Sequence, residues 1–285
     1  MLQRPPRRPR LVIFDLDGVV YRGLEPVPGA AELINDLHRR RVRVRYATNN
    51  SMATREAYVE RLASMGVRAA VPEIVTSTSA TVGYLRHHLP QVQHVLGVGS
   101  SAMIAELRAA GLEVTPVAEL ARPDYQGETL KSAVDAVVVG LDQAYDYIRI
   151  AVAATAVRRG AAFVATNADL RYPTARGFLP GAGSLVAAIR AASGGVEPII
   201  VGKPQPTMFA EILEDARVKP EAAVVVGDNP DADIVAGHRS GIFTVLILTG
   251  VADAALADGL AGERKPDLVV ADHAELGRQF DQWLS

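Results

Sequence analysis

Short, strongly apolar runs alternate along the chain with longer segments in which apolar residues recur at helical spacing. This alternation is the pattern of consecutive βα units, which form parallel sheets covered by helices. Several runs show no polar alternation, as expected of strands that are buried on both faces. The predicted strands are Leu11–Phe14, Val42–Ala47, His94–Val98, Ala136–Val139, Ala162–Ala165, Ile199–Val201, Ala223–Val226, Thr244–Leu248 and Leu268–Val270. The predicted helices, which complete an α/β fold, are Ala30–Arg39, Thr54–Ser64, Ala80–His88, Ser101–Ala109, Tyr145–Arg158, Ser184–Ala192, Thr207–Asp215 and Asp231–Arg239.

The length and composition of the chain indicate a globular protein of about two domains. The chain has 285 residues, of which 49% are hydrophobic and 22% charged, and domains commonly hold roughly 100–200 residues. Thirty Lys and Arg residues against 32 Asp and Glu residues give a net charge of −2, which lacks the broad positive field typical of nucleic-acid binding. The absence of cysteine excludes disulfides, thiolate metal sites and a cysteine nucleophile, and it fits a reducing cytoplasm.

The N-terminal segment is basic and proline-rich. The apolar stretch after it is interrupted at Asp15 and Asp17 after only four residues, which is too short for the core of a signal peptide. No other run approaches the ~18 apolar residues of a membrane-spanning helix. We therefore expect a soluble, cytoplasmic protein.

Two carboxylates follow the first predicted strand, in the segment Asp15-Leu16-Asp17-Gly18. The carboxyl ends of the strands are where open parallel sheets form their binding crevice. Two neighbouring carboxylates repel each other, and a divalent cation would relieve that repulsion. The pair therefore indicates either a metal-dependent site or a solvated turn with an acidic residue at each end.

Three other predicted strands end in polar segments. Residues 48–51, Thr-Asn-Asn-Ser, favour either an anion site or an N-cap cluster. Lys203 stands between Gly202 and Pro204 in a chain that has only four lysines against 26 arginines, which indicates that a compact ammonium group is needed there. Residues 227–233, Gly-Asp-Asn-Pro-Asp-Ala-Asp, have the composition of a metal site or of an acidic helix N-terminus.

Taken in order, the segments DLDGVV, ATNNS, GKP and GDNPDADI resemble the motifs of the haloacid dehalogenase-like (HAD) superfamily of aspartate-nucleophile phosphohydrolases. The resemblance implies that Asp15 is the nucleophile and Asp17 the general acid and base. It also implies phosphate binding by Thr48, Asn49 and Asn50, charge neutralisation by Lys203, and a Mg²⁺ site formed by Asp15, Asp17, Asp228 and Asp233, with Asp233 supporting the metal shell through water.

The spacing of these segments predicts an inserted domain. Asp17 and Thr48 are 31 residues apart, enough for one βα unit, whereas Ser51 and Lys203 are 152 residues apart. We expect residues 1–88 and 196–285 to form a Rossmann-like core and residues 89–195 an inserted α/β domain.

The insert resembles the type-2 cap of HAD subfamily IIA, the branch of NagD-like proteins, 4-nitrophenylphosphatases and phosphoglycolate phosphatases. The resemblance lies in residues 139–142, 165–167 and 179–184. Two departures are Ala168, where the branch usually has Pro, and Ala232, where it usually has Thr. The resemblance implies a cap that acts as a lid and pairs two copies into a homodimer, with Asn167–Arg171 and Tyr145–Tyr147 as substrate contacts.

The expected function is Mg²⁺-dependent hydrolysis of small phosphate monoesters through an aspartyl phosphate, without nucleic-acid or membrane partners. Candidate substrates are phosphoglycolate, glycerol phosphate, sugar phosphates, nucleoside monophosphates and 4-nitrophenyl phosphate. One alternative is a non-catalytic sensor of phosphorylated metabolites. A second is a dinucleotide-binding protein, because residues 97–102 match GxGxxA between a predicted strand and helix and Glu119 follows at a suitable distance.

Overall fold

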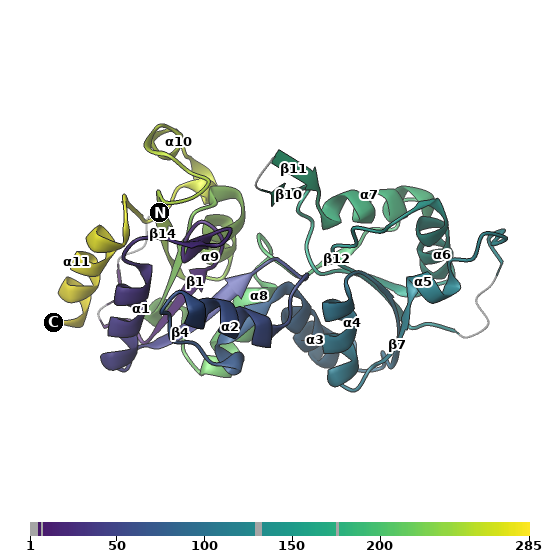
Figure 1. Cartoon of the computed structure of the whole chain (residues 1–285), viewed down its shortest axis with the longest axis horizontal. Helices are drawn as coiled ribbons and strands as arrows, with labels where there is room; N and C mark the ends of the chain where they lie inside the picture. The colour runs from purple at the N-terminus through teal and green to yellow at the C-terminus, as the bar shows by residue number, and fades with distance from the viewer. Residues whose placement is uncertain (1–4, 7, 129–132, 175–176) are drawn as a thin grey trace. The chain divides into compact units, whose positions relative to one another are not determined.

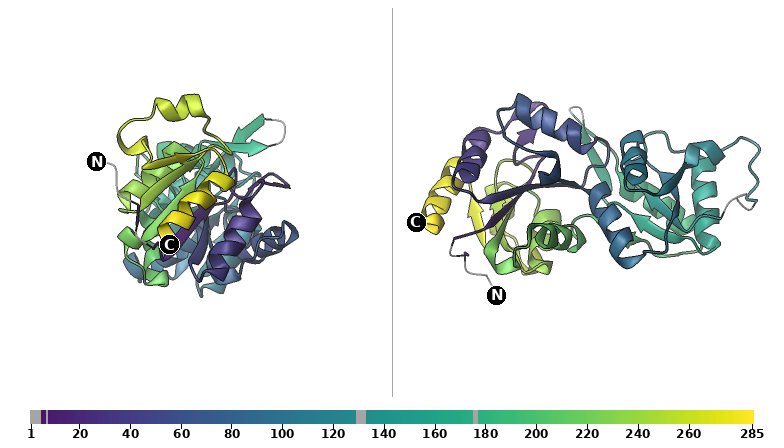
Figure 2. Two further views of the ribbon diagram at one scale, coloured as in Figure 1. Left: turned by 90° about the vertical axis from the view of Figure 1, so that its left-hand side faces the viewer. Right: turned by 90° about the horizontal axis from the view of Figure 1, so that it is seen from below.

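The computed structural model describes residues 5–6, 8–128, 133–174 and 177–285. The chain divides into two compact units (Figure 1). The first unit comprises Met1–Thr48, Arg55–Val75 and Lys203–Ser285, and the second comprises Asn49–Thr54 and Thr76–Gly202. Each unit contains its own mainly parallel sheet with helices on both sides (Figure 2), so the predicted α/β fold is confirmed.

The first unit is built on a six-stranded sheet of order β15-β14-β13-β1-β4-β5, in which the strands from β15 to β4 pair in parallel. The sheet strands are β1 (Leu11–Asp15), β4 (Arg43–Thr48), β5 (Ile74–Thr76), β13 (Ala223–Gly227), β14 (Phe243–Ile247) and β15 (Leu268–Val270). Strands β1, β13 and β14 are apolar and buried because they lie in the middle of the sheet. The other elements are β2 (Tyr21–Arg22), β3 (Glu25–Pro26), α1 (Ala30–Arg39), α2 (Arg55–Ser64), η1 (Val71–Glu73), α8 (Thr207–Ala216), η2 (Pro220–Ala222), η3 (Pro230–Ile234), α9 (Val235–Arg239), α10 (Ala254–Asp258), η4 (Gly262–Arg264) and α11 (His273–Leu284).

The second unit has a five-stranded parallel sheet of order β12-β9-β8-β6-β7. Its strands are β6 (His94–Val98), β7 (Glu113–Pro116), β8 (Ala136–Val139), β9 (Ala162–Ala165) and β12 (Ile199–Ile200), and an antiparallel hairpin joins β10 (Arg171–Thr174) to β11 (Gly177–Pro180). Its helices are α3 (Ser77–His88), α4 (Ser101–Ala109), α5 (Val117–Leu120), α6 (Tyr147–Arg158) and α7 (Ala182–Ala192). Helices α3 and α4 pack together, and α5, α6 and α7 form another packed group. The apolar residues of α6 and α7 thereby complete a core with β6, β8 and β9.

The predicted elements are all present, but several begin or end at other residues. Helix α3 begins at Ser77 rather than Ala80, because the Thr76 hydroxyl accepts a hydrogen bond from Ser79 N (3.0 Å) and caps it. Helix α6 begins two residues late because Asp146 is its N-cap. The segment predicted as the helix Asp231–Arg239 is divided into a π-type turn, η3, and the short helix α9. The elements missing from the prediction are β2, β3, β5, β7, β10, β11, α5, α10, α11 and the short helices η1, η2 and η4.

The observed division of the chain differs from the expected insert of residues 89–195. Helix α3 belongs to the second unit because it packs on α4 and because the Ser77 hydroxyl donates to Asn49 O (2.7 Å). Strand β12 belongs to it because it pairs with β9. The second unit therefore begins before residue 89 and continues past residue 195, to Gly202. Within the part of the chain that the structure describes, no helix has the length and apolarity to cross a membrane.

Candidate active site

The predicted catalytic segments of the first unit meet at one edge of its sheet. Strand β1 lies between β4 and β13, with Asp15 opposite Ala47 and Phe14 opposite Val226. All three strands run in the same direction, so their carboxyl ends place Asp15, Thr48 and the residues after Gly227 side by side. The sheet register thus brings together segments that are far apart in the sequence.

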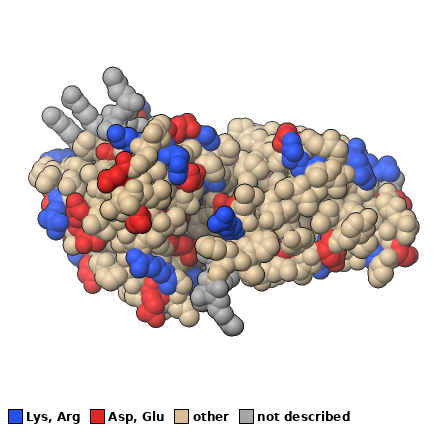
Figure 3. All heavy atoms as spheres, turned by 90° about the horizontal axis from the view of Figure 1, so that it is seen from above, with Lys and Arg blue, Asp and Glu red and all other residues tan. Residues whose placement is uncertain are grey.

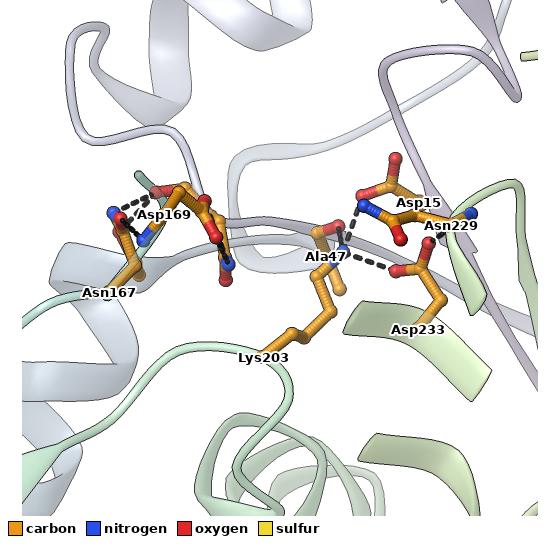
Figure 4. Close-up of polar contacts among 9 residues, drawn as sticks. Asp15, Ala47, Asn167, Asp169, Lys203, Asn229 and Asp233 are labelled. Carbon is orange, nitrogen blue, oxygen red and sulfur yellow. Dashed lines mark hydrogen bonds and ion pairs between the residues drawn. The ribbon is translucent and has the colours of Figure 1, made fainter. Parts of the chain in front are cut away.

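Lys203 is the central cation of this edge (Figure 4). Its Nζ donates to Asp15 Oδ1 (2.5 Å), to Asp233 Oδ1 (2.7 Å) and to the carbonyl oxygen of Ala47 (3.0 Å). The side chain is only 3% exposed. Burial alone would lower the pKa of Lys203, but Asp15 and Asp233 raise it overall, so the ammonium group stays charged.

Three carboxylates surround this ammonium group. Asp15, Asp228 and Asp233 each offer an oxygen atom, and these atoms lie within 4.8 Å of one another. Burial raises the pKa of Asp15, Lys203 opposes this rise, and Asp233 and Asp228 add to it. Burial and the neighbouring Asp233 also raise the pKa of Asp228, to about 7. The three carboxylates outnumber the one ammonium group of Lys203, and their mutual repulsion adds to the effect of burial on these pKa values.

This donor set fits a hard divalent cation. Mg²⁺ prefers carboxylate oxygens and usually keeps several of its waters. Three carboxylates with one ammonium group carry a net negative charge, which a divalent cation would neutralise. Asp228 is fixed in this cluster because Val251 N donates to its Oδ2 (2.6 Å). Gly18 and Gly250 leave no space for a Cβ next to the Asp228 carboxylate, so only glycine permits this approach at both positions. Asp233 is fixed by Asn229 N, which donates to its Oδ2 (3.1 Å).

Asp17, which the sequence also predicted as a metal ligand, is not among the three residues whose carboxylate oxygen atoms lie within 4.8 Å of one another. The chain leaves the strand after Asp15, so the alternation that would bring Asp17 onto the same side ends there. Asp17 is exposed and forms an isolated bridge with Tyr21 in the following turn. Desolvation by the surrounding chain raises its pKa, and the positive charges of Arg61 and Lys203 counteract this rise. Arg61 is not among the site residues predicted from the sequence.

The predicted phosphate-binding residues fall in different units. Thr48 ends β4 of the first unit and is buried, whereas Asn49 and Asn50 begin the first segment of the second unit. Asn50 Oδ1 accepts from Met52 N (2.8 Å), as an Asx turn does. Asn49 Nδ2 donates to both carboxylate oxygens of Asp169 (3.2 and 3.1 Å).

Asn167 completes a network within the second unit (Figure 4). Its Nδ2 donates to Asn49 O (2.8 Å) and its Oδ1 accepts from Asp169 N (3.1 Å). Gly181 and Gly183 pack so closely on the backbone of residues 168–169 that neither leaves space for a Cβ. The predicted cap loop at residues 167–171 is therefore held rigidly, and its Asp169 carboxylate is oriented by Asn49.

Comparison with known proteins identifies the class to which this site belongs. A family model described as haloacid dehalogenase-like hydrolase matches residues 12–113, and one described as HAD-hydrolase-like matches residues 200–276. The acid sugar phosphatase of Staphylococcus epidermidis is 35% identical over 239 residues, which cover 84% of this chain and 86% of that protein. The chain therefore belongs to the haloacid dehalogenase-like hydrolases.

Solved structures narrow this assignment. NagD from Escherichia coli K-12 matches with a TM-score of 0.82 at 32% identity, over 94% of this chain and 98% of NagD. The glycerol phosphate phosphatase of Mycobacterium tuberculosis, solved in complex with magnesium, matches with a TM-score of 0.83 at 33% identity, over 95% of this chain and 77% of that chain. Within the superfamily the chain belongs to subfamily IIA, as the resemblance to NagD-like proteins implies.

Proposed function

We propose that this protein is a Mg²⁺-dependent phosphatase that hydrolyses small phosphate monoesters through an aspartyl phosphate on Asp15. The observation that carries this proposal is the buried contact between Asp15 and Lys203, within a cluster of three carboxylates at the carboxyl edge of the sheet. A nucleophilic carboxylate needs a neighbouring positive charge to approach an anionic phosphoryl group. The phosphatase names of the related proteins support the same reaction class.

The site residues of the first unit have distinct roles in the proposed reaction. An Asp15 carboxylate oxygen forms a bond to phosphorus while the bond from phosphorus to the leaving-group oxygen breaks, and Asp17 gives its proton to that oxygen. Asp17 then takes a proton from water, whose oxygen attacks phosphorus, so that inorganic phosphate leaves and the Asp15 carboxylate is restored. Lys203 keeps Asp15 oriented and offsets negative charge on the phosphoryl oxygens. Mg²⁺ held by Asp15, Asp17, Asp228 and Asp233 would supply further charge neutralisation.

We assign phosphate binding to Thr48, Asn49 and Asn50, and the role of a cap to the second unit. Caps act as lids that exclude water and contact the leaving group. The exposed side chain of Tyr147 and the rigid loop around Asp169 are the proposed contacts. A homodimer formed through this unit and a cytoplasmic location complete the proposal. Acidic and basic side chains are mixed on the face shown in Figure 3, which supports a small substrate rather than nucleic acid.

The related acid sugar phosphatase and glycerol phosphate phosphatase favour polyol and sugar phosphates among the candidate substrates. The test is release of inorganic phosphate from glycerol phosphate, sugar phosphates, phosphoglycolate and 4-nitrophenyl phosphate at neutral pH. We expect activity with Mg²⁺, loss of activity in excess chelator, and recovery when Mg²⁺ is added back. Undiminished turnover in excess chelator would contradict the proposed metal dependence. Binding of these compounds without phosphate release would identify a sensor instead.

A further inference from the structure

A buried aromatic pair with a cation lies beneath the turn that carries Asp17. Tyr21 on β2 and Tyr58 on α2 are 0% and 1% exposed. The guanidinium carbon of Arg61 lies 5.4 Å from the ring centroid of Tyr21 and 5.9 Å from that of Tyr58. All three residues belong to the first unit. Planar guanidinium groups pack well on aromatic rings, so this arrangement fixes the ring of Tyr21.

The backbone of Tyr21 closes the turn that holds Asp17. Gly18 N donates to Tyr21 O (2.7 Å), and Tyr21 N donates to Leu16 O (3.2 Å). Asp17 itself forms the isolated bridge with Tyr21. A displacement of the Tyr21 ring therefore moves the backbone on both sides of Asp17. The packing of Arg61 and the orientation of Asp17 are linked through this one residue.

The charges in this cluster favour the same arrangement. Burial raises the pKa of Tyr21, so its phenol stays neutral. Burial raises the pKa of Asp17, and the positive charge of Arg61 opposes this rise. Arg61 therefore packs as a cation on the neutral ring of the residue that closes the turn.

We propose that Arg61 is a positioning residue, which packs on Tyr21 and thereby holds Asp17 in place to donate its proton to the leaving group. This inference rests on the proposed role of Asp17. Misplacement of a catalytic group by about 1 Å can cost on the order of 10²-fold in rate. A poor leaving group such as glycerol depends on protonation, whereas 4-nitrophenolate leaves readily without it. Loss of Arg61 should therefore slow phosphoenzyme formation selectively, depending on the leaving group.

The experiment measures the single-turnover rate of phosphoenzyme formation with glycerol phosphate and with 4-nitrophenyl phosphate, in the Mg²⁺-loaded enzyme. The variants are Arg61→Met, Arg61→Lys and, as the control, Arg39→Met, which changes an exposed arginine of α1. For Arg61→Met we expect a rate with glycerol phosphate that is roughly 10- to 10²-fold lower, and a rate with 4-nitrophenyl phosphate within about threefold of the unmodified enzyme. The KM values should change little, and Arg39→Met should resemble the unmodified enzyme.

Arg61→Lys retains the charge but not the planar packing, so we expect it to recover only part of the rate with glycerol phosphate. It also keeps the test decisive if Arg61→Met does not fold. Equal losses with both substrates, a change in KM alone, or full activity of both variants would each overturn the inference. Asp17→Asn, measured alongside, separates this inference from the proposed function. If Asp17→Asn shows the selective loss and Arg61→Met does not, only the role of Arg61 is wrong. If Asp17→Asn shows none, the assignment of Asp17 fails.

Discussion

The two parallel sheets of this protein have similar apolar strands, but the side chains that follow those strands differ. Strand β1 of the first unit and strand β8 of the second are both apolar and buried. In the second unit the side chains that follow the strands are mostly neutral and make hydrogen bonds to the backbone. Ser100 Oγ donates to Ser51 O (2.7 Å) and Asn167 Nδ2 to Asn49 O (2.8 Å). Polar side chains used in this way hold loops together and leave no charge to be balanced.

The acidic residues show the difference most clearly. Asp142, three residues after the end of β8, has its charge balanced by Arg149, whose Nη1 donates to Oδ2 at 2.9 Å. In the first unit, Asp15 and Asp233 both pair with Lys203, and Asp228 lies beside these two carboxylates. A buried excess of carboxylates lowers stability, and such excesses are typical of functional sites. Charge balance, rather than fold, therefore distinguishes the two sheets.

The largest expected effect comes from removing the same charge in both units. Asp15→Asn should lower turnover of 4-nitrophenyl phosphate by on the order of 10⁴-fold or more, because no phosphoenzyme can form. Asp142→Asn should keep turnover within about twofold and instead lower the free energy of unfolding by roughly 1–3 kcal/mol, since the partly buried Arg149 loses its partner. Steady-state kinetics and urea unfolding of both variants check this. Turnover retained by Asp15→Asn, or a phosphoryl group found on Asp17 or Asp228, would contradict the assignment.

The sequence predicted the strand-end residues of the first site but not the side-chain contacts around them. Apolar runs followed by acids placed Asp15 and Asp228 correctly at strand ends, because a parallel sheet brings its carboxyl ends together. The position of Asp17 depends on how the chain turns after β1, which no spacing reveals. Arg61 was missed because an arginine within a helical pattern looks like any solvated residue. The hairpin of β10 and β11 was missed because β11 is exposed along its length and has no apolar alternation.

The second prediction separates the two acids of the first strand end. Asp17→Asn keeps the nucleophile and the three clustered carboxylates but removes the proton donor and the base that activates water. Each such proton transfer is worth about 10²–10⁴ in rate. The variant should still be phosphorylated by 4-nitrophenyl phosphate and then accumulate aspartyl phosphate, whereas glycerol phosphate should load it poorly. Mass spectrometry of the Asp15 peptide measures this. Equal loading by both substrates would mean that another group donates the proton.

The third prediction concerns a buried histidine of the first unit that lies outside the site. His273, the first residue of α11, is 2% exposed, and neither ring nitrogen has a hydrogen-bond partner among the described residues. Burial lowers its pKa from 6.5 to about 4, against the opposing charges of Asp272 and Glu32. The folded state therefore prefers the neutral ring, and the stability gained from it is complete above pH 6.5 and lost as the pH falls towards 4.

The substitution His273→Phe replaces the ionisable ring by one that cannot take up a proton. Between pH 7.5 and pH 4.5 the unmodified protein should lose about 2–3 kcal/mol more free energy of unfolding than the variant does. His88→Phe is the control, because His88 is exposed and its stacking on Tyr84 is retained by a phenyl ring. Urea unfolding at both pH values measures the difference. Parallel loss of stability in the unmodified protein and His273→Phe would show that His273 is not responsible.

The last prediction has the smallest expected effect: the GxGxxA segment of the second unit, residues 97–102, should not bind a dinucleotide. Strand β6, helix α4 and the parallel strand β7 form the βαβ unit that a dinucleotide site requires. However, Gly97 lies within β6, where a Cβ would meet Ile104 and Val114, and the space above Gly99 is filled by Met103. The fingerprint glycines of a dinucleotide site instead leave room for the pyrophosphate.

The N-terminus of α4 is also already occupied, since Ser100 Oγ accepts a hydrogen bond from Met103 N (3.1 Å). The glycines here accommodate side chains of the protein itself. We therefore expect no saturable NAD(H) binding up to roughly 1 mM, equivalent to a binding free energy weaker than about −4 kcal/mol. Fluorescence titration with NADH measures this, and a shortened side chain in Met103→Ala tests whether Met103 alone blocks the turn. Micromolar affinity in the unmodified protein would show that the neutral strand ends of the second unit also form a ligand site, and the contrast between the two sheets would then fail.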